Sequence, residues 1–123
     1  MPRIVAALLL GSLLGACAYS YNVGVKAVDG STVALMPGQS ATLADGLLRY
    51  IRLSSDSRCK PGVQCVWAGD AVIALRWTPA TGDAQDFELH TMPRQRAFVV
   101  GKRTITLQAL ERGDAPRATL QVQ

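Results

Sequence analysis

The sequence predicts an all-β fold, a single antiparallel β-sandwich or barrel-like domain of about seven or eight short strands after a cleaved signal peptide. Three observations predict it. Apolar and polar residues alternate with a period of two through most of the chain. Turn-forming pairs such as Asp29-Gly30, Pro37-Gly38 and Asp45-Gly46 separate the alternating runs. The one apolar stretch with helical character, residues 4–14, lies in an N-terminal segment that we expect to be removed.

The N-terminal segment, residues 1–16, has the organisation of an export signal. One basic residue, Arg3, precedes an apolar run from Ile4 to Gly15 in which Ser12 is the only polar residue. A membrane-spanning helix needs about 20 apolar residues, and this run has only about twelve. The segment is therefore predicted to be a signal peptide rather than a membrane anchor.

The end of this segment, LGAC at residues 14–17, resembles the lipobox of bacterial lipoproteins. The resemblance implies cleavage before Cys17, a diacylglycerol on its sulfur and acylation of the new amine. An ordinary secretory signal cut near Ala16 or Ala18 is the alternative, and both interpretations export the mature chain. Lipoproteins kept in the inner membrane often carry Asp after the cysteine, where this chain has Ala18. We therefore expect a lipid anchor in the outer membrane, with the protein facing the periplasm.

Residues 17–22 are predicted to be a lipid-anchored tether, and residues 23–123 a single β-domain, since the mature chain from Cys17 to Gln123 has 107 residues, enough for one core. The full chain has 13 Lys and Arg against 9 Asp and Glu, so losing Arg3 with the signal leaves a net charge of about +3. The basic residues are scattered apart from Lys102-Arg103, which does not fit a nucleic-acid surface. The expected partners are the membrane, through the lipid on Cys17, and an envelope protein or glycan.

Strands are expected wherever the period-two pattern holds. In chain order the runs are residues 21–28, 31–36, 40–44, 47–54, 71–78, 86–91, 103–109 and 117–122. In the sixth run Phe87 and Leu89 point to one side of the strand, and Glu88 and His90 point to the other. One face of each strand is thus predicted to pack in a core.

Cys59 and Cys65 are predicted to form a disulfide, because they remain as a pair in an oxidising compartment once Cys17 is acylated. A zinc site would need four ligands, usually with C-x₂₋₄-C spacing, and a thioredoxin-like redox site would need C-x-x-C. The five intervening residues contain the turn Pro61-Gly62. Closing so short a loop is expected to contribute roughly 2 to 2.5 kcal/mol of stability.

The stretch from Asp56 to Asp70 is predicted to be a structural corner stapled by this disulfide, with Asp56, Arg58, Trp67 and Gly69 as its residues. Short oxygen-bearing side chains favour a turn at its start. Cys65 and Trp67 are two positions apart, so in an extended chain they point to the same side. We expect the indole of Trp67 to lie against the disulfide and to cover one end of the core.

The same stretch carries a family resemblance. DSRC at residues 56–59, a Pro-Gly-Val turn and CVWAG at residues 65–69 resemble the signature of small bacterial secreted proteins and lipoproteins of uncharacterised function. In that signature Pro often follows the first cysteine directly, whereas here Lys60 precedes Pro61 and the five-residue spacing is kept. The resemblance implies an extracytoplasmic β-domain and no particular activity.

The sequence offers little for catalysis. It contains no G-x-S-x-G, H-E-x-x-H or glycine-rich phosphate motif, and the single histidine, His90, falls on the polar face of its strand. Turn formation explains Asp56 and Asp70 without a paired-carboxylate site. His90 and Met92 are weak candidates for soft copper ligands. We expect no enzyme activity and no cofactor.

Three classes of function stay open. The first is a lipid-anchored, non-enzymatic binding or structural module of the cell envelope, which an apolar patch on a sheet face would favour. The second is a protease-inhibitor-like module using the loop at residues 59–65, which an exposed, rigid Lys60 would favour. The third is a periplasmic copper or redox accessory protein, which convergence of His90, Met92 and Met36 would favour.

Overall fold

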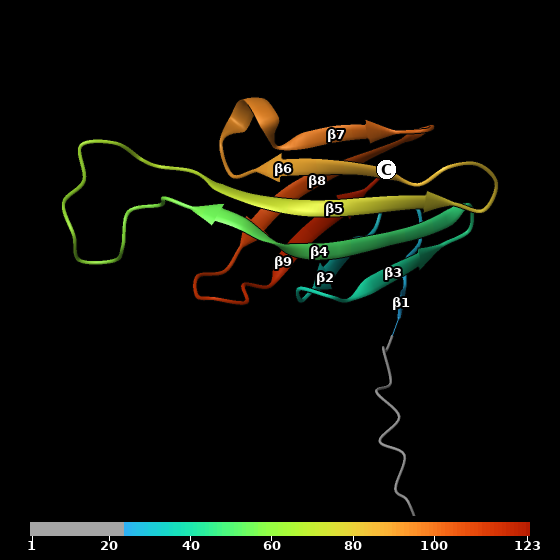
Figure 1. Cartoon of the computed structure of the whole chain (residues 1–123), viewed down its shortest axis with the longest axis horizontal. Helices are drawn as coiled ribbons and strands as arrows, with labels where there is room; N and C mark the ends of the chain where they lie inside the picture. The colour runs from blue at the N-terminus through green and yellow to red at the C-terminus, as the bar shows by residue number, and fades with distance from the viewer. Residues whose placement is uncertain (1–23) are drawn as a thin grey trace, which may run out of the picture.

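The computed structural model describes residues 24–123, which form nine β-strands and a short 3-10 turn in two stacked sheets (Figure 1). The elements are β1 (Val25–Lys26), β2 (Thr32–Leu35), β3 (Ser40–Leu43), β4 (Gly46–Asp56), β5 (Ala71–Pro79), β6 (Gln85–His90), η1 (Pro93–Gln95), β7 (Ala97–Val100), β8 (Arg103–Leu110) and β9 (Ala118–Val122). One sheet has the order β1-β3-β4-β5-β6 and the other β2-β9-β8-β7. The predicted all-β fold is confirmed, and its form is a sandwich. Within these residues no helix is long and apolar enough to cross a membrane.

The core lies between the sheets and follows from the period-two alternation. In β6, Phe87 and Leu89 are buried and Glu88 is exposed, as the pattern predicts. The largest fully buried side chains come from both sheets: Leu35, Leu48, Tyr50, Ile73, Leu75, Leu89, Ile105, Leu107 and Leu120. Aliphatic and aromatic side chains from two facing sheets therefore form one continuous core.

The longest strands, β4 and β5, pair in an antiparallel ladder in which β4 continues past its last buried residue, Tyr50. Their last pair joins Asp56 to Ala71, two residues beyond the end of the predicted strand 47–54. The register shifts between Tyr50 and Arg52 and again between Leu53 and Ser55, and such bulges bend and twist a strand. Strand β4 continues past its last buried residue, Tyr50, whereas β5 begins at the buried Ala71, so the connection between them leaves from the edge of the core.

Strand β7 was absent from the prediction. Its sequence AFVV is apolar throughout, so no apolar–polar alternation marks it, although burial does alternate: Val99 is 63% exposed and the adjacent Val100 is buried. Pairing with β8 makes it a strand, and the ring of Phe98 stacks on that of Phe87 with centroids 4.9 Å apart. Pairing with the next strand in a hairpin thus decides the conformation of these four residues.

The predicted strand 21–28 is also modified. Among the described residues only Val25–Lys26 form a strand, and this strand pairs parallel with β3, whereas the prediction was wholly antiparallel. The predicted signal peptide 1–16, Cys17 and the tether 17–22 lie outside the described residues.

Two polar side chains fasten loops to the sandwich. The buried guanidinium of Arg103 donates from Nε to Asp45 at 2.6 Å and from Nη1 to Asp29, which joins the β3–β4 and β1–β2 turns. The hydroxyl of Tyr50 donates to the carbonyl oxygen of Pro116 at 3.1 Å. Burial raises the pKa of Tyr50 to about 12, against the opposing charge of Arg58, so this phenol stays protonated.

Candidate functional site

The connection between β4 and β5, residues 57–70, extends away from both sheets as a long loop, which we call the β4–β5 projection (Figure 1). Its base is closed by paired hydrogen bonds between Ser57 and Asp70. The amide of Ser57 donates to the carbonyl oxygen of Asp70 at 2.8 Å, and the Ser57 hydroxyl both donates to that oxygen and accepts from the Asp70 amide at 2.9 Å. These bonds continue the β4–β5 ladder by one pair. We call this base of the projection, around Ser57 and Asp70, its root.

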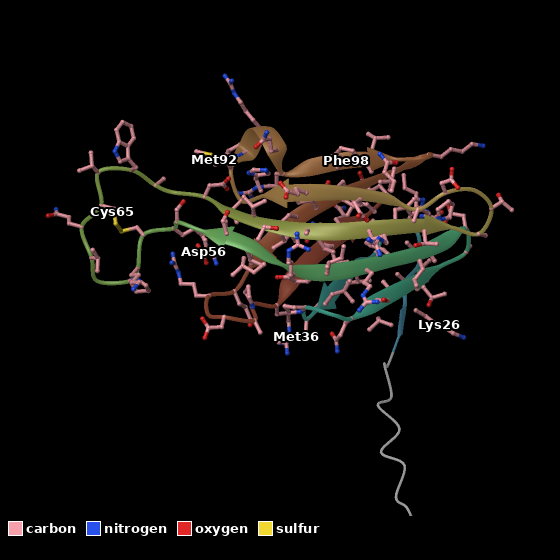
Figure 2. The ribbon with its side chains drawn as sticks, viewed as in Figure 1. Lys26, Met36, Asp56, Cys65, Met92 and Phe98 are labelled. Atoms are coloured by element: carbon pink, nitrogen blue, oxygen red, sulfur yellow. A yellow bond between two sulfur atoms is a disulfide. The ribbon has the colours of Figure 1, made fainter. Side chains whose placement is uncertain are left out.

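A disulfide joins Cys59 and Cys65 within the projection, with their Cα atoms 5.9 Å apart, as the sequence predicts. Figure 2 shows Cys65 well outside the sandwich. Between the two cysteines the amide of Val63 donates to the carbonyl oxygen of Lys60 at 3.2 Å, and Gly62 takes a φ of 79°. Positive φ favours glycine, so the Pro61-Gly62 sequence suits this turn.

Arg58 fixes one side of the root to the other sheet. Its guanidinium pairs with Asp56 through Nε at 2.9 Å and Nη2 at 2.7 Å. It also donates to the carbonyl oxygens of Leu110 and Glu111, both at 2.7 Å, where β8 ends. The hydrogen bonds from Arg58 hold the pKa of Asp56 below its usual value, outweighing burial. The carboxylate and the guanidinium therefore stay charged together.

Asp70 fixes the other side of the root to the segment after β6. One carboxylate oxygen accepts from the hydroxyl of Thr91 at 3.0 Å and the amide of Met92 at 3.1 Å, and the other lies 2.5 Å from Nδ1 of His90. Burial acts to raise the pKa of Asp70, but the hydrogen bonds from His90, Met92 and Thr91 outweigh it and the pKa is lowered. His90 thus contacts the start of the neighbouring strand and is only partly exposed.

Gly69 has two reasons to be glycine. Its φ is +70°, a conformation that side chains with a Cβ rarely adopt. A Cβ added there would also lie 2.0 Å from the carbonyl oxygen of Ser57. The two arms of the root could not approach as closely with any other residue.

Trp67 does not cover the core, so this part of the predicted corner is wrong. Its side chain is 82% exposed, next to Val66 at 90% and near Val63 at 57%. The spacing of Cys65 and Trp67 fixes their directions relative to each other, but the whole segment lies outside the sandwich, where there is no core to cover. The projection consequently presents three apolar side chains to solvent, and of these Val63 and Val66 were not among the predicted site residues.

The charged residues between Ser57 and Gly69 are all basic. Residues 57–69 contain no Asp or Glu, and they contain Arg58 and Lys60. Arg58 is paired with Asp56 at the root, whereas Lys60 is exposed in the turn. The outer part of the projection is therefore apolar and weakly cationic.

The methionine and histidine candidates do not converge. Met92 lies beside the root of the projection, and Met36 lies on the opposite side of the molecule in Figure 2. In residues 24–123 no three His, Cys, Asp or Glu side chains are grouped as a metal site would require. The condition set for a copper site from His90, Met92 and Met36 is not met.

Asp70 and His90 resemble two members of a hydrolytic triad, in which a carboxylate orients an imidazole. No hydroxyl or thiol in the described part of the chain hydrogen-bonds to the ring of His90. The Thr91 hydroxyl is occupied, because it donates to Asp70 and accepts from the amide of Ala71 at 3.0 Å. The arrangement serves as a brace for the root.

Comparisons of the chain with protein-family models, with curated proteins and with solved structures gave no significant match. The geometry of the projection is therefore the main guide to function.

Proposed function

We propose that this protein is a lipid-anchored, non-enzymatic binding module of the cell envelope and that the β4–β5 projection is its contact surface. One observation carries the proposal: Val63, Val66 and Trp67 are exposed together on a loop that a disulfide and a braced root hold in place. The observation named as favouring this class was an apolar patch on a sheet face, and the apolar patch that supports the proposal lies on a loop instead.

Physical chemistry supports a contact at this place. Large apolar side chains that are exposed close together are typical of interaction sites. Tryptophan is among the residues that most often contribute the largest share of the binding energy of an interface. A loop already held in one conformation loses little entropy when it binds. The disulfide and the hydrogen bonds between Ser57 and Asp70 supply that restraint.

The anchor rests on the sequence. The lipobox-like LGAC at residues 14–17 supports acylation of Cys17 and a location at the outer membrane, facing the periplasm. Cys17→Ser should move the protein from the membrane fraction to the soluble fraction or leave uncleaved precursor. Equal incorporation of labelled palmitate by parent and variant would refute the anchor without touching the role of the projection.

The contact surface can be tested with a photo-crosslinking amino acid placed at Val66 in the full-length chain, expressed in cells. A matched control places it at Val28, which is 72% exposed in the turn before β2. We expect a distinct crosslinked species from position 66 and none from position 28. Identical patterns from the two positions would show that the projection is not the contact surface.

A protease-inhibitor-like module is the second candidate, because Lys60 is exposed in the disulfide-bridged turn. A cationic side chain on a rigid loop fits the acidic specificity pocket of a trypsin-like enzyme. This candidate predicts inhibition of trypsin by the parent protein and its loss in Lys60→Ala. Absence of inhibition at micromolar concentration would eliminate it.

A further inference from the structure

We propose that the partner of the β4–β5 projection is the surface of the membrane that holds the anchor. In this arrangement Val63, Val66 and Trp67 enter the interfacial layer of a bilayer containing anionic lipid, and Lys60 lies among the headgroups. The inference rests on the proposed function, because it names the partner of the same surface.

The side chains of the projection suit a lipid interface. Tryptophan is enriched at the level of the headgroups, where an apolar ring with one polar edge is accommodated. The absence of Asp and Glu from residues 57–69 removes repulsion from anionic lipid, and exposed Lys60 adds attraction. An apolar surface beside a cation is the combination that holds proteins at an anionic bilayer surface.

The backbone of the projection limits how deep it goes. Within residues 57–70 the backbone hydrogen bonds join Ser57 to Asp70 and Val63 to Lys60, which leaves most of the backbone groups between them to water. Such groups are excluded from hydrocarbon, and a dry protein cleft would have to supply a partner for each. A hydrated headgroup layer supplies water to the backbone while the three side chains are buried.

The anchor and the projection can reach the same membrane when the domain lies with the direction from β1 to the projection parallel to the membrane surface. Val25 is aligned with Ala41, and Ala41 with Leu48 of β4. From Leu48 to Asp56, β4 covers about 27 Å, and the projection begins there, toward the other end of the molecule from β1 (Figure 1). The chain from Cys17 to Gly24 spans at most about 25 Å when extended. That length is enough for this orientation.

The test uses the mature chain carrying Cys17→Ser and vesicles of phosphatidylcholine with or without 30% phosphatidylglycerol. The chain has two tryptophans, and Trp77 is only 4% exposed, so Trp67 is the one that can respond to lipid. We expect co-sedimentation with the anionic vesicles, a blue shift of tryptophan emission and quenching by lipids brominated near the headgroup. Far-UV circular dichroism checks that each variant is folded.

Matched variants distinguish vesicle binding through the projection from nonspecific binding of exposed apolar residues. Trp67→Ala should weaken partitioning into anionic vesicles by at least about tenfold, and Val66→Ala by about threefold. Val28→Ala removes the same group from a similarly exposed valine elsewhere and should leave partitioning unchanged. No binding to anionic vesicles, or equal losses for Val66→Ala and Val28→Ala, would overturn the inference.

Two further outcomes distinguish this inference from the proposed function. If position 66 crosslinks to a protein and the vesicles do not bind, the projection is still the contact surface and the lipid partner is wrong. The lipidated protein on dilute vesicles tests which membrane is used. Quenching of Trp67 without vesicle clustering supports contact with the anchoring membrane, whereas clustering shows contact with an opposing one and overturns the inference.

Discussion

Arg58 donates a hydrogen bond of 2.7 Å to the carbonyl oxygen of Leu110, a residue 52 positions later in the chain. This contact joins the root of the projection, at the end of one sheet, to the end of β8 in the other. The side chain of Arg58 is only 12% exposed, so the bond is largely shielded from water. The direction in which the projection leaves the sandwich therefore depends on this guanidinium together with the contacts of Asp70 on the other side of the root.

Arg58→Ala should lower the free energy of unfolding by about 2 kcal/mol, because it leaves Asp56 and two carbonyl oxygens without their charged partner. Arg58→Lys keeps the charge but not the fork and should recover less than half of the loss. Urea unfolding measures both. Arg49→Ala, an exposed change on the adjoining strand β4, is the control. A loss below about 0.5 kcal/mol for Arg58→Ala would mean that the brace is not stabilising.

The two tryptophans should respond in opposite ways to truncation. Trp77 is buried, so Trp77→Ala should lower the free energy of unfolding by about 3 to 5 kcal/mol through the cavity it leaves. Trp67→Ala should change it by less than about 0.5 kcal/mol, because the indole is already in solvent. Thermal and urea unfolding measure both variants. A large loss of unfolding free energy for Trp67→Ala would support the predicted packing of its indole over one end of the core.

Replacing Cys59 and Cys65 together by serine should lower the global free energy of unfolding by less than about 1 kcal/mol. The loop-entropy value of about 2 kcal/mol assumes a folded state that stays ordered without the bridge, and here the freed loop can loosen outside the core. Cleavage by chymotrypsin after Trp67 should become several-fold faster. A global loss of 2 kcal/mol or more, with unchanged cleavage, would tie the disulfide to the core.

Gly69→Ala and Gly62→Ala form a matched pair, since both glycines have positive φ. Only at position 69 does an added Cβ meet another atom, the carbonyl oxygen of Ser57. Gly62→Ala should lower the free energy of unfolding by about 1 kcal/mol, and Gly69→Ala by at least 1 kcal/mol more. Urea unfolding decides, and equal effects would show that the root tolerates a wider separation of its two arms.

The carboxylate of Asp70 should make stability depend on acid pH. Its pKa is lowered in the folded protein, so its contribution is fully present above the unfolded value of about 4 and is lost as the pH falls through the folded value. Asp70→Asn should lower the free energy of unfolding by about 1 to 2 kcal/mol at pH 7, with the difference from the parent shrinking as the pH falls below about 4. Asp83→Asn, on an exposed loop, is the control. A pH-independent difference would show that the charge of Asp70 does not matter.

The sequence predicted most of the fold because burial follows from local alternation. Phe87 and Leu89 are buried as their spacing requires, and turns occur at Gly30 and Gly38, which both have positive φ. The disulfide was predicted because compartment and cysteine count left a single pair. The strand at Ala97–Val100 was missed, because its conformation depends on pairing with β8 rather than on its own pattern.

The site was only partly predictable, for a similar reason. The spacing of Cys65 and Trp67 gives their relative direction but not whether that side meets the core. The decisive fact is that β4 continues to Asp56, past its last buried residue Tyr50, which local sequence does not encode. The contact between Asp70 and His90 likewise requires the register that aligns Val72 with His90.

The root of the projection has a consequence for how this domain can change. The hydrogen bonds between Ser57 and Asp70, the Arg58 brace and Gly69 lie at the root, and none of residues 59–68 belongs to the buried core. The outer ten positions can therefore be exchanged for other sequences of similar length while the sandwich stays intact. Selection, or a protein engineer, can alter what this domain touches independently of what keeps it folded.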